Sequence, residues 1–492
     1  MVLLLVLRLL PTCLIFLTAQ TLASTGNATD KIALDELLRS ALKSAQAQQL
    51  ILQAQTFNLD RSQARYDGRL ETKMDISHSV AESPSSNLQI DKIAKKNLQV
   101  KYLKNIRSGT QLQVEWALDH QDMEFVAALD NQVGFQSQGA LTVKQSLWRN
   151  AFGRAWQAEE QALILTDKAS KESLQANLEA LAMVIVKQYY QAWLLQVQLQ
   201  ATYQHIKLQK RLLRVSKVKF DLGTADKADI LQIRASLAGL QQRVKDSLNS
   251  LRMVWAQLVT AINLPVVYVN TDISGMRLTL DKDYQASQAS CAELRNKNRA
   301  QLQSASLRSF KHSLQALEHQ IAQHKDSLKP EVFAALRVAN NGIDTSFASS
   351  VWQSVADWNV SASVSIGLNI ELGKHRQYAN LAESLKQKQI TTLSIDQAQT
   401  ELQVEILNAC NDFARLISKE QTFQKIYQQQ RQRIALQEER FRIGQIDVLQ
   451  IVQASNDLIE AELRLKETAQ ELGLTVWKIR KADGSLFRML RD

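Results

Sequence analysis

The chain contains one stretch of sequence twice. The first copy, FDLGTADKADILQIRASLAGLQQRVKDSL, starts at Phe220, and the second, FRIGQIDVLQIVQASNDLIEAELRLKETA, starts at Phe441. One constant offset, the 221 residues between these two phenylalanines, relates several identical residues in the copies. The matched pairs include Gly223 with Gly444, Asp226 with Asp447, Ile230 with Ile451, Leu237 with Leu458 and Arg243 with Arg464. Repetition at so long a spacing indicates duplication of a large unit rather than a short solenoid repeat.

Each copy predicts a hairpin of two helices with a glycine at its tip. A helical pattern runs up to Gly223 or Gly444 and resumes a few residues later. Glycine adopts the left-handed conformation that commonly ends a helix, which lets the chain reverse. We therefore expect two long helical hairpins.

The rest of the chain predicts the same order of elements in each half: helix, strands, long helix, tip and helix. For the first half we expect a helix over residues 30–67 and alternating strands over 70–80, 98–102, 112–118 and 141–147. A helix over 153–219 then leads to the glycine tip, and a second helix returns from it to Ile262. For the second half we expect a helix over 289–328, a strand over 332–338, a polar loop, a strand over 360–372, a helix to Arg442 and a final helix to Lys481. A helix of ~65 residues would be ~100 Å long, far more than a compact domain needs.

The first 23 residues form an apolar block that predicts a secretory signal, cleaved before Ser24. The predicted organisation is then a first repeat over 24–264, a connecting segment over 265–287 and a second repeat over 288–492. Outside the signal the sequence has two cysteines, Cys291 and Cys410, so at most one disulfide within the chain is open to it. No other run reaches the roughly 18 apolar residues that a transmembrane helix needs.

The sequence carries no motif of an enzyme, a phosphate-binding loop or a metal centre. The only close group of histidines, His312, His319 and His324, is spaced by seven and five residues, which does not favour a metal pair on one helix face. The formal net charge of +10 is spread through helical segments among acids and amides, which indicates a solvated helix surface rather than a nucleic-acid interface. We expect no catalytic residues, no metal and no cofactor.

Both repeated stretches carry the pattern F-x-x-G, followed within six residues by D-[VI]-L and then by recurring Leu and Ala positions. This pattern, present once in each half, resembles the TolC-like outer membrane efflux protein family. The resemblance implies a mainly helical protein whose hairpins form a periplasmic α-barrel and whose strands, four or possibly more per protomer, join an outer-membrane β-barrel shared by three protomers. The segment over 98–118 is either an additional hairpin or holds the true first membrane strand, because the offset places 111–117 on 332–338.

The resemblance also assigns functional residues at the two tips. The expected pore constriction and gate consists of Asp226, Asp229, Gln232, Asp447, Gln450 and Gln453. The expected contact with a periplasmic adaptor consists of Gly223, Thr224, Gly444 and Gln445. Carboxylates repeated around a narrow pore would attract cations, but Asp226 and Asp447 are equally placed to cap the helices that follow them. Four tryptophans near strand ends favour an aromatic girdle over ordinary burial: Trp116, Trp148, Trp352 and Trp358.

The predicted function is an outer-membrane channel of a Gram-negative bacterium, extending into the periplasm. It would be the passive exit duct of a tripartite efflux pump or a type I secretion system. The implied partners are two further copies of the chain, a periplasmic adaptor, an inner-membrane transporter of the RND or ABC type, and outer-membrane lipid, with no nucleic acid. The alternative is an exported periplasmic coiled-coil scaffold, which would leave the alternating strand at 360–372 unexplained.

Overall fold

A computed structural model describes residues 31–32, 34–80, 90–125, 132–224, 226–262, 277–280, 284–297, 301–486 and 488. The chain divides into two compact units. The first comprises Met1–Gln53, Leu174–Ser304 and Gln399–Asp492, and the second Ala54–Ser173 and Ala305–Ala398. The expected signal over 1–23 and most of the expected connecting segment lie outside the described residues. Each unit takes segments from both expected repeats, and the division of the sequence into repeats stays a prediction.

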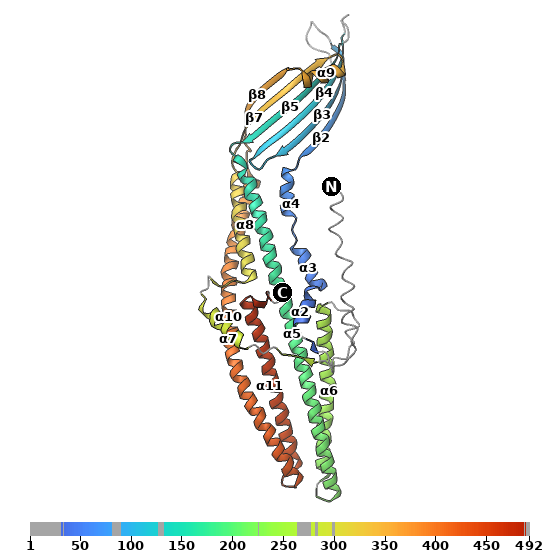
Figure 1. Ribbon diagram of the computed structural model, residues 1–492, viewed down its shortest axis with the longest axis vertical. Helices are drawn as coiled ribbons and strands as arrows, with labels where there is room; N and C mark the ends of the chain where they lie inside the picture. Colours follow the sequence, from blue (N-terminus) through green and yellow to red (C-terminus); the bar gives the residue numbers. More distant parts are fainter. Residues whose placement is uncertain are drawn as a thin grey trace. The chain divides into compact units, whose positions relative to one another are not determined.

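The second unit is built on a six-stranded antiparallel sheet with the strand order β2-β3-β4-β5-β7-β8 (Figure 1). Its strands are β2 (Arg69–Val80), β3 (Ile90–Asn105), β4 (Thr110–Phe125), β5 (Gln132–Ser146), β7 (Glu331–Asp344) and β8 (Val360–Asn369). Every neighbouring pair is antiparallel. The expected strands are therefore present, and most are longer than the sequence pattern indicates.

The strand register sorts the side chains of this sheet onto two faces. Residues paired across antiparallel strands point to the same side, and successive residues alternate. One continuous row across all six strands is Leu70, Tyr102, Val114, Leu141, Val338 and Ala362. We call the side that carries this row the apolar face. The opposite side, the polar face, carries Glu71, Lys101, Gln113, Thr142, Arg337 and Ser363 at neighbouring positions.

The segment over 98–118 contributes to two full strands of this same sheet. It contains the end of β3, a turn in which Gly109 has a φ of 75°, and the first half of β4. The offset of 221 residues places β4 on β7 and much of β5 on β8, so the strands of the first half that have no counterpart are β2 and β3. Six strands per chain are consistent with the prediction of four or possibly more.

The prediction of a polar loop before residue 360 is wrong in one respect, because this segment contains the helix α9 (Phe347–Ala356). Its apolar residues Phe347, Val351 and Val355 recur every four positions, but the serines between them hide the pattern. The helix lies against β5 and β7, as Figure 1 shows. A short helix of this composition is stabilised by what it packs on, which a local pattern does not reveal.

Four long helices carry most of the first unit, and two of them continue into the second. They are α5 (Arg154–Asp221), α6 (Lys227–Ile262), α10 (His375–Arg442) and α11 (Val448–Ala482), which form the two hairpins predicted (Figure 1). The cores that hold them are apolar. One is centred on Ile185, Tyr189 and Tyr190 of α5, which pack with Leu258 of α6 and Trp477 of α11.

A disulfide between Cys291 and Cys410 joins α7 (Tyr284–Asn296) to α10, with 5.7 Å between the two Cα atoms. The sequence left this pairing open. Around the bridge lies a second apolar core that contains Leu294, Phe413 and Leu472. The disulfide therefore ties α7 to α10 within the first unit, in the middle of a packed cluster.

Two expected helices are each divided. The helix expected over 30–67 begins instead with a two-residue strand, β1 (Lys31–Ile32), which pairs in parallel with β6 (Arg277–Leu278). It continues as α2 (Leu34–Leu42), α3 (Ala45–Ala54), α4 (Asn58–Gln63) and a 3-10 turn over Ala64–Tyr66. The break before α3 is stabilised by Ser44, whose hydroxyl accepts a hydrogen bond from the Ala47 amide at 3.2 Å. Such a hydroxyl cap starts a new helix although no glycine or proline marks the boundary in the sequence.

The helix expected over 289–328 is likewise two helices, α7 and α8 (Ala305–Ser327). The disulfide of Cys291 and a hydrogen bond of 2.7 Å from Arg295 to Asn411 hold α7 on α10. These contacts connect residues more than 100 positions apart, so helical periodicity could not reveal them. Among the described residues, no helix is long and apolar enough to span a membrane.

Candidate functional site

The two hairpin tips have the same backbone hydrogen bonds. In the first, the amide of Thr224 donates to the carbonyl of Lys219 at 2.8 Å, and that of Gly223 donates to Phe220 at 2.9 Å. In the second, Gln445 donates to Arg440 at 2.9 Å and Gly444 to Phe441 at 3.2 Å. This pattern is the Schellman motif, which needs a left-handed residue at the turn. Gly223 and Gly444 supply it, with φ angles of 73° and 85°.

The acidic residues after each glycine act as helix caps in this structure. Asp447 precedes α11, and its carboxylate accepts a hydrogen bond from the Gln450 amide at 2.8 Å. Asp226 precedes α6, and its carboxylate accepts from the Ala228 amide at the longer distance of 3.4 Å. The capping alternative is therefore present at both positions, more tightly in the second copy. Capping leaves the outer side of each carboxylate free, since both residues are exposed.

The remaining residues of the expected constriction lie on the first two turns of α6 and α11. Asp229 is half-buried, whereas Gln232, Gln450 and Gln453 are exposed. The residues expected to contact an adaptor, Gly223, Thr224, Gly444 and Gln445, are exposed at the two turns. A single copy therefore places all of these predicted residues at the hairpin ends, and their roles as gate or adaptor contact stay predictions.

One contact at the tips was missed by the sequence reasoning. The side chain of Lys219, on α5, donates a hydrogen bond to the carbonyl of Phe441, on α10. Its ammonium group also lies 4.2 Å from the centre of the Phe441 ring, a cation–π contact. Phe441 is 3% exposed and packs with Leu212, Ile233 and Ile451, so all four helices meet around it. The offset between the copies hinted at this residue, but nothing local marks it as buried.

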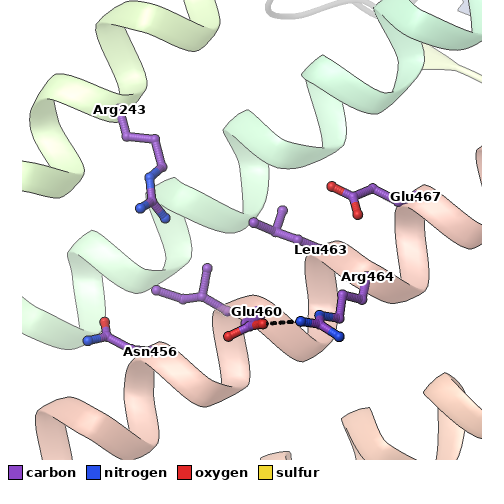
Figure 2. Close-up of a pocket in the computed structure, with 7 residues that line it drawn as sticks. Arg243, Asn456, Glu460, Leu463, Arg464 and Glu467 are labelled. Atoms are coloured by element: carbon purple, nitrogen blue, oxygen red, sulfur yellow. Dashed lines mark hydrogen bonds and ion pairs between the residues drawn. The ribbon is translucent and has the colours of Figure 1, made fainter.

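A shallow groove lies between α6 and α11, farther from the tips (Figure 2). Figure 2 shows Arg243 reaching in from α6, while Asn456, Glu460, Leu463, Arg464 and Glu467 line it from α11. Arg464 is paired with Glu460 at 2.5 Å. Arg243 and Arg464 occupy equivalent positions in the two copies. Arg464 forms an ion pair with Glu460, whereas Arg243 has no ion-pair partner among the described residues.

Polar groups are buried between the hairpins. His205 of α5 is buried, and its Nε2 lies 3.7 Å from a carboxylate oxygen of Glu462 on α11. One turn away, Gln209 donates to the hydroxyl of Ser455 at 3.4 Å. Burial, together with the negative charge of Glu462, raises the pKa of Tyr427 on α10. The contact between α5 and α11 is therefore partly polar, which apolar periodicity alone does not predict.

The polar face of the sheet carries a connected set of charged and amide side chains. Glu115 is buried there and accepts hydrogen bonds from Gln99 and, at 2.9 Å, from Gln113. Arg337 lies 3.8 Å from Glu115 and donates to Gln138 at 2.8 Å. This side of the sheet is suited to water, as the opposite side is suited to an apolar environment.

In the part of the chain that the structure describes, no group of three or more His, Cys, Asp or Glu side chains is arranged to hold a metal ion. His312, His319 and His324 all lie on α8. Nothing in their arrangement adds a ligand site to the hairpin tips.

Comparison with known proteins gives a consistent result. The sequence model of the family described as "Outer membrane efflux protein" matches residues 297–485. None of the curated proteins compared matches the chain.

Solved structures match nearly the whole chain. The outer-membrane channel OprN has a TM-score of 0.64 at 15% identity, with 92% of this chain and 89% of OprN covered. The outer membrane protein VceC from Vibrio cholerae has a TM-score of 0.63 at 12% identity, with 92% and 96% covered. The CmeC outer membrane channel of Campylobacter jejuni has a TM-score of 0.59 at 12% identity, with 92% and 85% covered. At these identities the likeness establishes the fold. Together with the family match over 297–485, it confirms the resemblance of this chain to the outer membrane efflux proteins.

Proposed function

We propose that this chain is the outer-membrane exit duct of a tripartite efflux pump or a type I secretion system. The observation that carries the proposal is a two-faced antiparallel sheet of six strands in the same chain as two long hairpins with matching tips. The family match and the channel folds support an efflux channel role. They also support the predicted location in the outer membrane of a Gram-negative bacterium.

The sheet is proposed to form part of a barrel shared by three copies. Its edge strands, β2 and β8, run antiparallel to each other because the sheet has an even number of alternating strands. Six strands are too few to enclose a water-filled channel, and an open edge favours pairing with another chain. Pairing β2 of one copy with β8 of the next would close a ring, and three copies of six strands would give eighteen, a number that leaves an aqueous channel in known barrels.

The two faces of the sheet then have distinct roles. The apolar face, with exposed Leu70, Met74, Val364 and Ile366, would contact lipid. The polar face, with Glu115 and its hydrogen-bonded neighbours, would line the water-filled channel. Conduction through it would be passive, with energy supplied by an inner-membrane transporter of the RND or ABC type.

The gate is proposed at the hairpin tips. In a symmetric trimer Asp229, the half-buried acid of the first copy, would recur around the axis and form a ring that attracts cations. Docking of a periplasmic adaptor at Thr224 and Gln445 would shift the hairpins from a closed arrangement of the gate to an open one. Opening would then require breaking or rearranging the contact of Lys219 with Phe441, which joins the two hairpins.

The test is the single-channel conductance of the purified protein in a planar lipid bilayer. We expect small, discrete, cation-preferring steps, and a loss of cation preference in Asp229→Asn. The matched control is Asp246→Asn, an exposed acid farther along the same helix and outside the expected constriction, which should keep the preference. Steps with unchanged selectivity in Asp229→Asn would move the constriction elsewhere. Folded, membrane-embedded protein that gives no steps would contradict the channel and favour a scaffold.

A further inference from the structure

The helix α9 lies on the apolar face of the sheet, at the end remote from α5. Ser354 of α9 shares a hydrogen bond of 2.8 Å with Ser137 of β5, and the ring of Phe347 meets that of Phe135 edge-on at 6.0 Å. Both Ser137 and Phe135 lie on the apolar face, since the register places them in line with Leu141. The proposed function turns this face toward lipid, so the position of α9 there needs a physical reason.

The reason is a polar notch in the apolar face beneath the helix. Where the neighbouring strands β4 and β8 present Trp116, Leu118 and Val360, β5 and β7 present small or polar residues: Ser137, Gly139, Asn340 and Gly342. The amide nitrogen of Asn340 donates to the carbonyls of Ser354 and Asp357 at 2.9 and 2.8 Å. Polar groups facing hydrocarbon without partners are costly, and α9 provides these partners.

The notch is also shaped for a helix. A Cβ on Gly342 would overlap the carbonyl oxygen of Ser350, so only glycine permits the backbone of α9 to approach this closely. Ser350 and Ser354, both buried, are spaced by four residues and face the sheet. Small residues at this spacing allow close packing of helices within membranes.

The side of α9 that faces away from the sheet is apolar. Trp352 is 68% exposed and Val355 is 73% exposed, and Trp358 just after the helix is 92% exposed. No residue from Phe347 to Ala356 is charged, whereas Asp344 lies three residues before the helix and Asp357 directly after it. A helix with an uncharged outer side and tryptophans suits the boundary between hydrocarbon and headgroups.

The tryptophans mark two levels along the sheet. Trp358 precedes β8, while Trp148 lies at the opposite end, where the amide of Leu147 donates to Val332, the strand partner of Leu368. From Trp358 to Leu368 the chain covers roughly 33 Å along an extended strand, or about 25 Å across the membrane at a tilt of ~40°. An apolar band of about 25 Å between two aromatic girdles is the dimension of a membrane barrel.

We infer that α9 is a lipid-contacting helix, seated in the notch of β5 and β7, which holds Trp352 and Val355 in the lipid at one membrane boundary. The inference rests on the proposed function, because it requires the apolar face to be in a membrane. The outer side of α9 is covered by the lipid bilayer rather than by a second copy, since it continues the apolar face on which exposed Val364 and Ile366 also lie.

The test uses single cysteines labelled with a small fluorophore in phospholipid vesicles. Val355→Cys reports on the outer side of α9, Ile366→Cys on the apolar face of β8, and Ser363→Cys on the polar face of the same strand. Cys291 and Cys410 are joined in a disulfide, so the chain without the added cysteine gives the background. Quenching is compared between aqueous iodide and nitroxide phospholipids labelled near the headgroup or near the chain end.

We expect Val355→Cys to be quenched several-fold more by headgroup-proximal nitroxide lipid than Ser363→Cys, and to be shielded from iodide. Ile366→Cys, on the lipid-facing side of β8, should be quenched by nitroxide phospholipid and shielded from iodide. Iodide quenching of Val355→Cys, or no quenching by either agent, would overturn the inference if Ile366→Cys still contacts lipid; the second result would mean that another copy covers α9. Iodide quenching of Ile366→Cys would instead contradict the membrane sheet and with it the proposed function. Trp352→Cys serves as a second reporter of α9 if Val355→Cys fails to fold.

Discussion

The two hairpin tips share a backbone but not an environment. Phe220 and Phe441 occupy the same position before the glycine, yet Phe220 is 41% exposed and Phe441 is 3% exposed. Phe441 is covered by Lys219 and joined to the cluster of Leu212 and Ile233, whereas Phe220 faces outward. A repeated motif therefore fixes the turn but leaves the burial of its side chains to the surroundings.

The same comparison extends along the two long helices. The offset that joins the tips places Tyr189 of α5 on Cys410 of α10. Tyr189 is fully buried, donates to the Thr279 carbonyl at 3.1 Å and accepts from the Thr279 amide at 2.9 Å. Cys410 forms the disulfide to α7. Both positions thus attach another segment of the chain to a long helix. Tyr189 holds the segment of Thr279 by hydrogen bonds, and Cys410 holds α7 by a covalent bond.

The largest difference is expected between the two phenylalanines. Phe441→Ala should lower the free energy of unfolding by about 3–5 kcal/mol, because it empties a buried site between four helices. Phe220→Ala, its matched control, should cost less than about 1 kcal/mol because its ring is already partly in water. Urea unfolding followed by circular dichroism measures both. Equal losses would mean that a neighbouring copy buries Phe220 in the assembled protein.

The two anchors of the long helices should differ by a smaller amount. Replacing Cys291 and Cys410 together by serine should lower the free energy of unfolding by about 2–4 kcal/mol. Tyr189→Phe, which removes the hydroxyl and with it the hydrogen bonds to Thr279, should cost about 1–3 kcal/mol. Thermal unfolding with and without reductant gives the comparison, since reductant should destabilise the parent chain but not the double serine variant. No effect of reductant on the parent would contradict the disulfide.

The caps at the two tips should differ less again. Asp447→Ala should cost about 1 kcal/mol, since it removes a 2.8 Å hydrogen bond to the first turn of α11. Asp226→Ala removes a longer contact of 3.4 Å and should cost less. The corresponding asparagine variants should recover most of the loss. A larger cost at Asp226 would place that carboxylate in an interaction absent from a single copy.

The smallest expected effect is a dependence on alkaline pH. Burial raises the pKa of Tyr189 above its ordinary value of 10.0. The folded state therefore retains this proton more tightly than the unfolded state, and stability should fall as the pH rises through and above about 10. When the free energy of unfolding is measured between pH 9 and 11, its slope against pH should be smaller for Tyr189→Phe than for the parent chain. An unchanged slope would assign it to other groups, such as Tyr427, whose pKa is also raised.

The sequence by itself determined the hairpins, their glycine tips and the two faces of the strands. These features follow from local chemistry. A long helical pattern without Gly or Pro needs no distant partner to be recognised, the left-handed turns at Gly223 and Gly444 need glycine, and the alternation of 360–372 defines an apolar and a polar side. The expected tip residues therefore lie where the sequence placed them.

Only the tertiary structure decided which of these elements meet. The pairing of Cys291 with Cys410, the burial of Phe441 under Lys219, and the seat of α9 on Gly342 all depend on residues far apart in the chain. The division of the helices expected over 30–67 and 289–328 likewise depends on distant residues. An apolar pattern indicates that a residue is buried, but it does not identify the residues that it packs against. Packing selects one set of partners among many that the pattern allows, because burial energy depends on the shape of the whole neighbourhood.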